Sequence, residues 1–273
     1  VISGSGWPLA MGGFLITGIG LTLMGIVAIA ISGTSINDMA DRVHPKFGAL
    51  LGSVIMIIIG PLFAIPRTAA TTYEIAMVPT MPGFSNILFI IIFFAITLYF
   101  SIRPASVVDS IGKVLTPVLL IVLLILIGKG IITPIGETIT LTDAAGFSRG
   151  FTEGYQTMDA LGSVILASII IESVIAKGYT DKKTRVSMTI KAGIIAAAGL
   201  MVVYVGLMYV GATVAGSFDA GVERTALMIA ITVVLLGGFG KYALAVTIGL
   251  ACLTTSIGLT AAAGKFFNDI SKG

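Results

Sequence analysis

The residues from Gly150 to Ser163, G-F-T-E-G-Y-Q-T-M-D-A-L-G-S, place polar groups within a long apolar segment. Five of these polar side chains are Glu153, Tyr155, Gln156, Thr157 and Asp159. A carboxylate at the depth of the hydrocarbon is costly unless a partner, water or a ligand compensates its charge. The stretch therefore predicts a binding site inside a membrane-spanning helix.

Two glycines in this stretch, Gly150 and Gly154, predict that the helix unwinds there. Unwinding exposes backbone N–H and C=O groups, which hydrocarbon cannot satisfy but a bound zwitterion or cation can. We expect the second half-helix to begin near Thr157, where its positive dipole end favours a carboxylate. The first half would end near Glu153 and favour an ammonium group or a cation. This arrangement is typical of the midplane site of a transporter.

The composition is that of an integral membrane protein. Apolar residues make up 56% of the chain and charged residues 11%, whereas about 25% of the residues of a soluble domain are charged. The apolar runs do not alternate with period two, which favours a helix bundle over a barrel. With a single cysteine, Cys252, and a single histidine, His44, a zinc site and Cys-His catalysis are both disfavoured.

The apolar runs predict seven membrane-spanning helices and one shorter helix. Crossing about 30 Å of hydrocarbon takes about 20 residues. The predicted spans are residues 7–31, 47–72, 85–101, 113–132, 150–176, 192–214 and 241–263. Residues 225–236 are too few to cross, and we expect them to lie on the outer face. This topology gathers most Lys and Arg residues on one side, which the positive-inside rule assigns to the cytoplasm.

The ends of the sequence predict a piece of a longer protein. The chain starts at Val1 without the basic region of a signal peptide, and it stops shortly after Phe266. We expect further segments on both sides.

Two prolines lie inside the second predicted span. Each of Pro61 and Pro66 lacks an N–H and crowds the carbonyl four residues earlier, which frees the C=O groups of Ile57 and Leu62 as cation ligands. The alternative is a kink that only shapes the bundle. Arg67 follows directly, and a snorkelling side chain, a carboxylate partner and a gate are all open interpretations.

The last predicted span carries hydroxyl groups on one face. Ala251, Thr254 and Thr255 are spaced i, i+3 and i+4, so they share a side of the helix. Two hydroxyl oxygens and a carbonyl there can join other oxygens around a hard cation such as Na⁺. The alternative is helix packing, in which small polar residues are common. Ser256 points away from this face and is the weaker candidate.

Two further patterns have simpler explanations. The segment 237–242 superficially looks like a phosphate loop, but its lysine is not followed by Ser or Thr and no strand precedes it. The basic residues between Lys177 and Lys191 fit a cytoplasmic loop, so we expect no nucleic-acid partner.

Three ordered motifs resemble the bacterial branched-chain amino acid:cation symporter family. They are G-P-L-F-A-I-P-R-T at residues 60–68, G-Y-Q-T-M-D-A-L at 154–161 and A-C-L-T-T-S-I-G-L-T at 251–260. The likeness covers essentially the whole chain. Members of that family are plasma-membrane carriers that take up leucine, isoleucine and valine with Na⁺ or H⁺.

The resemblance implies a fold and a set of missing parts. It predicts an all-α polytopic membrane protein with part of the inverted-repeat (5+5) fold of the amino acid-polyamine-cation superfamily. The seven spans would be the second to the eighth of about twelve. The family's first span, the inverted partner of the interrupted span, would be absent.

The resemblance also implies roles for single residues. Gly154, Tyr155, Gln156, Thr157 and Asp159 would bind the substrate, with Phe63 and Met158 against its branched side chain. Ala251, Thr254 and Thr255 would form the eighth span's part of a Na⁺ site. Glu153, Pro66 and Arg67 would act in gating. No cofactor and no chemical catalysis are implied beyond the coupling ion, and the oligomeric state stays open.

Two other classes of function compete with a carrier. A seven-span receptor or photosensor would match the number of spans but leaves the glycine-flanked polar stretch unexplained. A membrane-embedded hydrolase would use Glu153 and Asp159 as a carboxylate pair, for which a separation of about 3 Å is typical.

Overall fold

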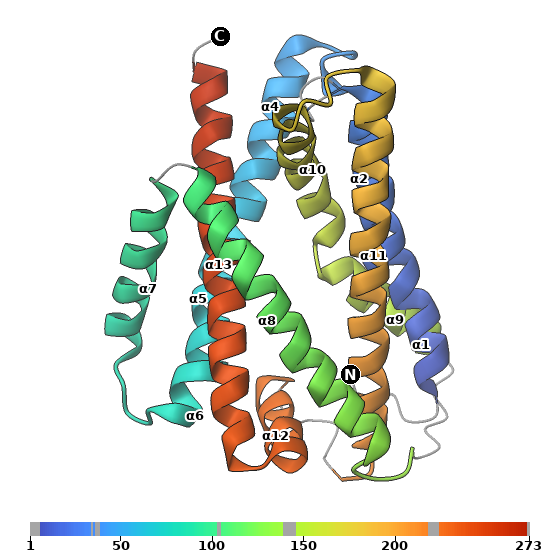
Figure 1. Ribbon diagram of the computed structural model, residues 1–273, viewed down its shortest axis with the longest axis vertical. Helices are drawn as coiled ribbons and strands as arrows, with labels where there is room; N and C mark the ends of the chain where they lie inside the picture. Colours follow the sequence, from blue (N-terminus) through green and yellow to red (C-terminus); the bar gives the residue numbers. More distant parts are fainter. Residues whose placement is uncertain are drawn as a thin grey trace. The chain divides into compact units, whose positions relative to one another are not determined.

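The computed structural model describes residues 6–33, 35, 39–102, 105–138, 146–217 and 224–271. Every regular element in these ranges is a helix (Figure 1). Five helical stretches are long and apolar enough to cross a membrane: Trp7–Ser32, Lys46–Thr80, Gly146–Ala176, Lys182–Thr213 and Gly238–Asn268. The predicted all-helical, multi-pass membrane architecture is therefore confirmed.

The first of these stretches contains a wider helical turn. It comprises α1 (Trp7–Phe14), the π-helical segment η2 (Leu15–Gly20) and α2 (Leu21–Ser32). Pro8 lies in the first turn of α1, where a missing N–H costs nothing. A π segment inside an α-helix is rare and is frequently found at functional sites.

The second stretch is longer than the sequence predicted. It runs through α4 (Pro45–Ile57), η3 (Ile58–Ala64), α5 (Ile65–Thr72), η4 (Tyr73–Met77) and α6 (Val78–Thr80). The predicted span ends at residue 72, whereas the helix continues to Thr80. Pro61 lies inside the π segment η3, and Pro66 and Pro79 lie in the first turns of α5 and α6. The π segment and the first turns of α5 and α6 therefore accommodate the prolines, and the helix continues past them.

The next two helices fall short of a full span in their apolar length. Helix α7 (Asn86–Ser101) has 16 residues, and Ser85 caps it by accepting the Leu88 N–H at 3.5 Å. Helix α8 (Ala105–Ile132) begins before the predicted residue 113, and its apolar part is Thr116–Ile132. Arg103 and Pro104, which follow the third predicted span, lie outside the described residues. The count of seven spans thus stays a prediction.

The remaining helices are α9 (Gly146–Gln156), α10 (Asp159–Ala176), α11 (Lys182–Thr213), α12 (Arg224–Leu236) and α13 (Gly238–Ser271). Helix α11 begins ten residues before the predicted residue 192, because its basic first turns are helical too. Asp181 caps it by accepting the Thr184 N–H at 3.0 Å. That bond is the largest of the causes that hold the pKa of Asp181 below its ordinary value. Helix α12 has 13 residues, which matches the predicted short helix.

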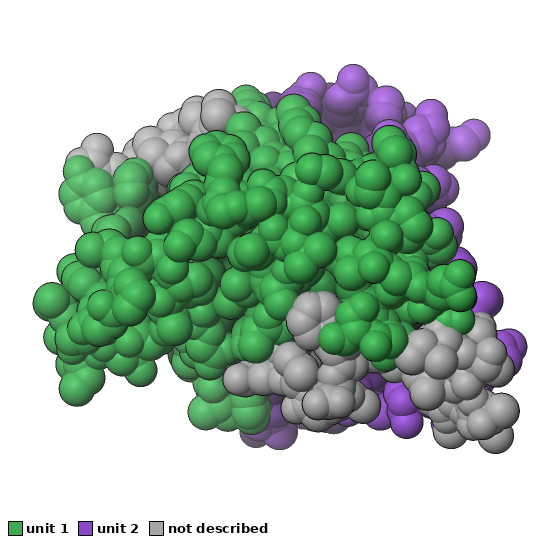
Figure 2. All heavy atoms as spheres, turned by 90° about the horizontal axis from the view of Figure 1, so that it is seen from below, with its two compact units in different colours: residues 1–5, 60–141, 206–264 green, residues 6–59, 142–205, 265–273 purple. Residues whose placement is uncertain are grey.

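The chain divides into two compact units, which Figure 2 colours separately. Unit 1 contains the described residues of 60–141 and 206–264, and unit 2 those of 6–59, 142–205 and 265–273. The core of unit 1 joins α8, α11 and α12 through Leu126, Val210, Val214, Leu227, Ile231 and Leu235. The core of unit 2 joins α2 and α10 through Ile26, Ile29, Ala30, Ala167 and Ile171.

Candidate functional site

The helix that carries the polar stretch is broken at two residues. Helix α9 ends at Gln156, α10 begins at Asp159, and the chain changes direction between them (Figure 1). Met158 adopts φ 60° and ψ 11°, and it is the one non-glycine residue with positive φ among the described residues. This left-handed conformation costs about 1–2 kcal/mol for a residue with a Cβ. Such strain persists only where the surrounding structure enforces it, commonly at binding sites.

The predicted break is confirmed, but its predicted cause is wrong. Helix α9 continues through Gly150 and Gly154, and the chain unwinds only after Gln156. Gly146, Gly150 and Gly154 recur every four residues and are all buried. A Cβ on Gly150 would overlap the backbone of Ala10. These glycines therefore let another backbone approach closely, as small residues do between membrane helices.

The backbone that approaches is the one containing the first π segment. Thr17 of η2 is 1% exposed and donates its hydroxyl hydrogen bond to the Phe151 carbonyl at 2.8 Å. A Cβ on Gly154 would overlap the Thr17 hydroxyl, and one on Gly13 would overlap the Phe147 carbonyl. The two segments thus touch through glycine on both sides, which holds α9 firmly next to the break.

One hydroxyl group connects the two half-helices. Thr157 Oγ1 donates to the Gly154 carbonyl at 2.8 Å and accepts the Asp159 N–H at 3.4 Å. These bonds pair a carbonyl at the end of α9 and an amide at the start of α10, two groups that a helix leaves without intrahelical partners. The break is therefore an ordered turn in which the Gly154 carbonyl and the Asp159 amide both have hydrogen-bond partners.

Asp159 lies in the first turn of α10 and has a partner on a distant helix. Tyr204 of α11 donates its phenolic hydrogen bond to Asp159 Oδ2 at 3.2 Å. The Phe14 ring packs edge-on against the Tyr204 ring, with centroids 4.8 Å apart. Sequence reasoning missed Tyr204. The available signal was a tyrosine within an apolar run, since a buried phenol normally finds a hydrogen-bond partner.

The first turn of α10 carries a negative charge of its own. The second half-helix begins at Asp159, and the aspartate itself supplies an anion in the first turn, where the helix dipole favours one. The expectation that this end receives a substrate carboxylate stays a prediction.

The other predicted residues of this stretch are not all gathered at the break. Glu153 is half-buried on α9, on the opposite side of the break from Asp159. Tyr155 is 66% exposed and Gln156 is exposed, so both lie on the surface of the chain. Of the predicted substrate residues in this stretch, Gly154, Thr157 and Asp159 are the ones that the hydrogen bonds and close packing bring together.

The predicted substrate residue Phe63 and two of the predicted gating residues, Pro66 and Arg67, belong to unit 1, whereas the third gating residue, Glu153, belongs to unit 2. Phe63 lies in η3 and is 51% exposed, while Pro66 and Arg67 lie in the first turn of α5 and are exposed. Further along α5, the Thr72 methyl group lies 3.6 Å from the Cβ position of Gly249 on α13. The face of α13 predicted to bind Na⁺, which begins at Ala251, therefore directly follows a contact between α13 and α5.

The hydroxyl groups on α13 meet at one carbonyl oxygen. Thr254 and Thr255 both donate to the Ala251 carbonyl, each at 2.9 Å, in agreement with their predicted shared face. Helix α13 is unbroken here. Ser256 is buried and accepts a hydrogen bond from Thr97 of α7 at 3.3 Å, so it serves helix packing. A Na⁺ site on the Ala251 face stays a prediction.

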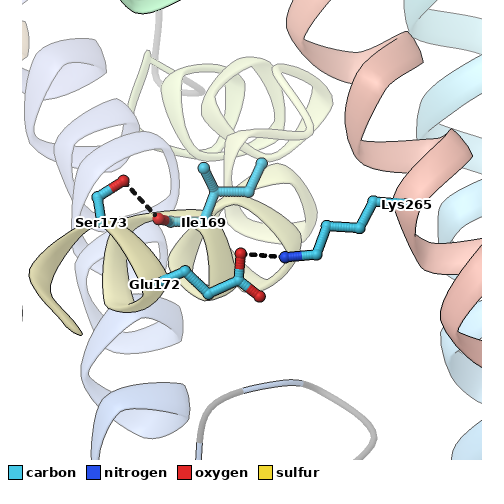
Figure 3. Close-up of polar contacts among 4 residues, drawn as sticks. All are labelled: Ile169, Glu172, Ser173 and Lys265. Atoms are coloured by element: carbon cyan, nitrogen blue, oxygen red, sulfur yellow. Dashed lines mark hydrogen bonds and ion pairs between the residues drawn. The ribbon is translucent and has the colours of Figure 1, made fainter. Parts of the chain in front are cut away.

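An ion pair joins the far end of α10 to α13. Glu172 and Lys265 point toward each other and form a salt bridge, beside the Ser173 hydroxyl that donates to the Ile169 carbonyl (Figure 3). Each of the two charged side chains is about half exposed, at 48% for Glu172 and 50% for Lys265. Pairs with such exposure contribute about 0–1 kcal/mol.

Comparison with known proteins decides the family. The family model described as branched-chain amino acid transport protein matches residues 1–273. The chain belongs to this family. It is 42% identical over 268 residues to the branched-chain amino acid permease BraB of Bacillus subtilis, a match that covers 96% of the chain and 60% of the permease.

A second relative of the chain comes from Pseudomonas aeruginosa. The chain is 37% identical over 272 residues to its branched-chain amino acid transport system 2 carrier protein, covering 97% of the chain and 61% of the carrier. The chain thus spans about three fifths of the length of these relatives. No solved structure matches it. These relatives are named as a permease and a carrier.

Proposed function

We propose that this chain takes part in importing leucine, isoleucine and valine across the bacterial plasma membrane. The mechanism would be secondary active transport by alternating access, with Na⁺ or H⁺ as the coupling ion. The observation that supports this proposal is the helix break at Thr157 and Met158, with a carboxylate in the first turn beyond it. The fold would be part of a 5+5 inverted repeat.

The substrate would bind at the break through its charged groups. Its ammonium group matches the Asp159 carboxylate, and the carboxyl end of α9 also attracts positive charge. Its branched side chain would lie against apolar groups, for which Phe14 and Met158 of unit 2 are the candidates. Burying a leucine-sized side chain contributes about 1.5–3 kcal/mol. These two kinds of contact together would select a zwitterion with an apolar side chain.

The coupling ion would bind where hard oxygen atoms gather. For Na⁺ the candidates are the Ala251 carbonyl and the hydroxyl oxygens of Thr254 and Thr255, whose lone pairs stay available while their protons bond to the helix backbone. For H⁺ the candidate is the Asp159 carboxylate. Glu153, Pro66 and Arg67 are proposed to act in opening and closing access.

The test is uptake of radiolabelled leucine into proteoliposomes that contain the purified full-length protein. We expect uptake to require an inward gradient of Na⁺ or of H⁺, and only one of the two if a single ion couples. Asp159→Asn is expected to reduce uptake strongly under both gradients, and Thr254→Ala only under a Na⁺ gradient. Thr133→Ala is the control, because Thr133 is exposed, directly follows α8 and donates its hydroxyl hydrogen bond to the Lys129 carbonyl of that helix. Uptake that survives Asp159→Asn would refute the assignment of the substrate site.

A further inference from the structure

Tyr204 contacts the proposed substrate site but has no role in the mechanism proposed above. It lies in the second half of α11, 45 positions from Asp159 in sequence, and its phenolic hydroxyl donates to Asp159 Oδ2 at 3.2 Å. The apolar residues around it in sequence, Met201 to Leu207, offer its hydroxyl no side-chain partner on its own helix. The hydroxyl therefore bonds across helices, to the carboxylate beside the strained turn.

The Tyr204 ring is held in place independently of its hydroxyl. Phe14 is 8% exposed and meets the Tyr204 ring edge-on, at a centroid distance of 4.8 Å and an interplanar angle of 63°. Phe14 is the last residue of α1, and its carbonyl lies within contact range of a Cβ on Gly154. Three helices thus converge on this tyrosine: α1 through Phe14, α10 through Asp159, and its own helix α11.

The chemistry of the pair differs from that of a packing contact. Hydrogen bonds to an ionised carboxylate are stronger and more directional than bonds between neutral groups. A phenylalanine would fill the same volume and keep the contact with Phe14. Burying the hydroxyl here costs free energy of desolvation. The hydrogen bond to the Asp159 carboxylate is what offsets this cost.

We infer that Tyr204 is a positioning residue, which orients the Asp159 carboxylate to receive the ammonium group of an amino-acid substrate. This inference rests on the proposed function and assigns a role within its substrate site. It predicts that Tyr204 controls affinity only for ligands that carry the ammonium group, and only while Asp159 is a carboxylate.

The test compares Tyr204→Phe with the unchanged protein in equilibrium binding of radiolabelled leucine to the purified full-length protein. The loss of one hydrogen bond to a charged group is expected to raise the Kd about tenfold. The unfolding temperature is expected to stay unchanged, since the ring and its contact with Phe14 remain. Tyr209→Phe, on the same helix, is the control for loss of a phenolic hydroxyl and is expected to leave the Kd unchanged.

A second pair of measurements separates positioning from a structural role. In an Asp159→Asn background, Tyr204→Phe is expected to change the leucine Kd by less than about twofold, because partners in one interaction are not additive. Inhibition by 4-methylpentanoate, which is leucine without its amino group, is expected to be equally strong with Tyr204 and with Tyr204→Phe.

Two outcomes overturn the inference in different ways. If the unchanged protein binds leucine and Tyr204→Phe binds it equally well, or weakens leucine and 4-methylpentanoate alike, Tyr204 does not position Asp159, while the proposed function stands. If the unchanged protein binds none of leucine, isoleucine and valine, the proposed function fails and this inference fails with it.

Discussion

The left-handed backbone of Met158 gives a direct test of the helix break. The two variants Met158→Gly and Met158→Ala both remove the side chain, which is 39% exposed, and differ only in the Cβ. Alanine retains the cost of a left-handed residue, about 1–2 kcal/mol, whereas glycine has none. Glycine loses about 0.4–1 kcal/mol through the greater freedom of the unfolded chain. We therefore expect Met158→Gly to be more stable than Met158→Ala by about 0.5–1 kcal/mol.

A continuous helix would reverse the order of the two variants. Within a right-handed helix, alanine is more stable than glycine by about 1 kcal/mol. Met201 provides the matched control, because it is 43% exposed and lies inside the continuous helix α11. There we expect Met201→Ala to be the more stable variant by about 1 kcal/mol.

The measurement is the free energy of unfolding in mixed micelles, followed by far-ultraviolet circular dichroism as the fraction of a denaturing detergent increases. The sign of the difference between the glycine and alanine variants is the result that matters, since detergent affects both members of a pair alike. If Met158→Ala is as stable as Met158→Gly or more stable, residue 158 is in a right-handed helix and the break does not exist.

Three further predictions concern packing, capping and charge. Gly150→Ala is expected to lower the free energy of unfolding by about 1–3 kcal/mol, because the new Cβ overlaps the Ala10 backbone. The control Gly162→Ala is expected to be neutral or stabilising, because its Cβ meets no atom within 4 Å. Equal effects of the two variants in thermal unfolding would contradict the close contact at Gly150. The pKa of Asp181 is lowered in the folded protein, so its charge stabilises above the unfolded value of about 3.8 and this contribution is lost as the pH falls through the folded value. Asp181→Asn keeps a good helix cap and is expected to flatten that part of the acid limb in a pH series of unfolding temperatures, and an unchanged limb would speak against the lowered pKa. Glu172→Lys and Lys265→Glu are each expected to lower the free energy of unfolding. The double variant, which restores the ion pair with its charges exchanged, is expected to be more stable by about 0.2–1 kcal/mol than the sum of the two single losses predicts. If the losses are strictly additive, the ion pair contributes nothing.

The ends of the helices show where hydropathy misleads. Apolar runs predicted the centres of the long helices, but α11 begins ten residues before residue 192. Hydropathy measures which residues prefer hydrocarbon, whereas a helix continues as long as its backbone bonds are satisfied. Charged residues of the first turns, supported by the Asp181 cap, continue the helix outside the apolar run.

Glycine is ambiguous in sequence for a similar reason. Gly150 and Gly154 predicted an unwound segment, and the structure places them inside α9, in contact with α1 and η2. A glycine weakens a helix, but it also permits two backbones to touch. Which effect matters depends on whether another helix crosses at that point, and the local sequence does not contain that information.

By itself, the sequence determined the all-helical membrane class, a break in the polar stretch, the shared face of Thr254 and Thr255 and the family resemblance, because composition and spacing along one helix are local properties. Only the tertiary structure decided that the break lies at Met158, that glycines pack α9 against a π segment, and that Tyr204 bonds to Asp159. Those features depend on which segments meet in space. Contacts between residues as distant as 45 positions arise from the packing of whole helices, which no short stretch of the chain encodes.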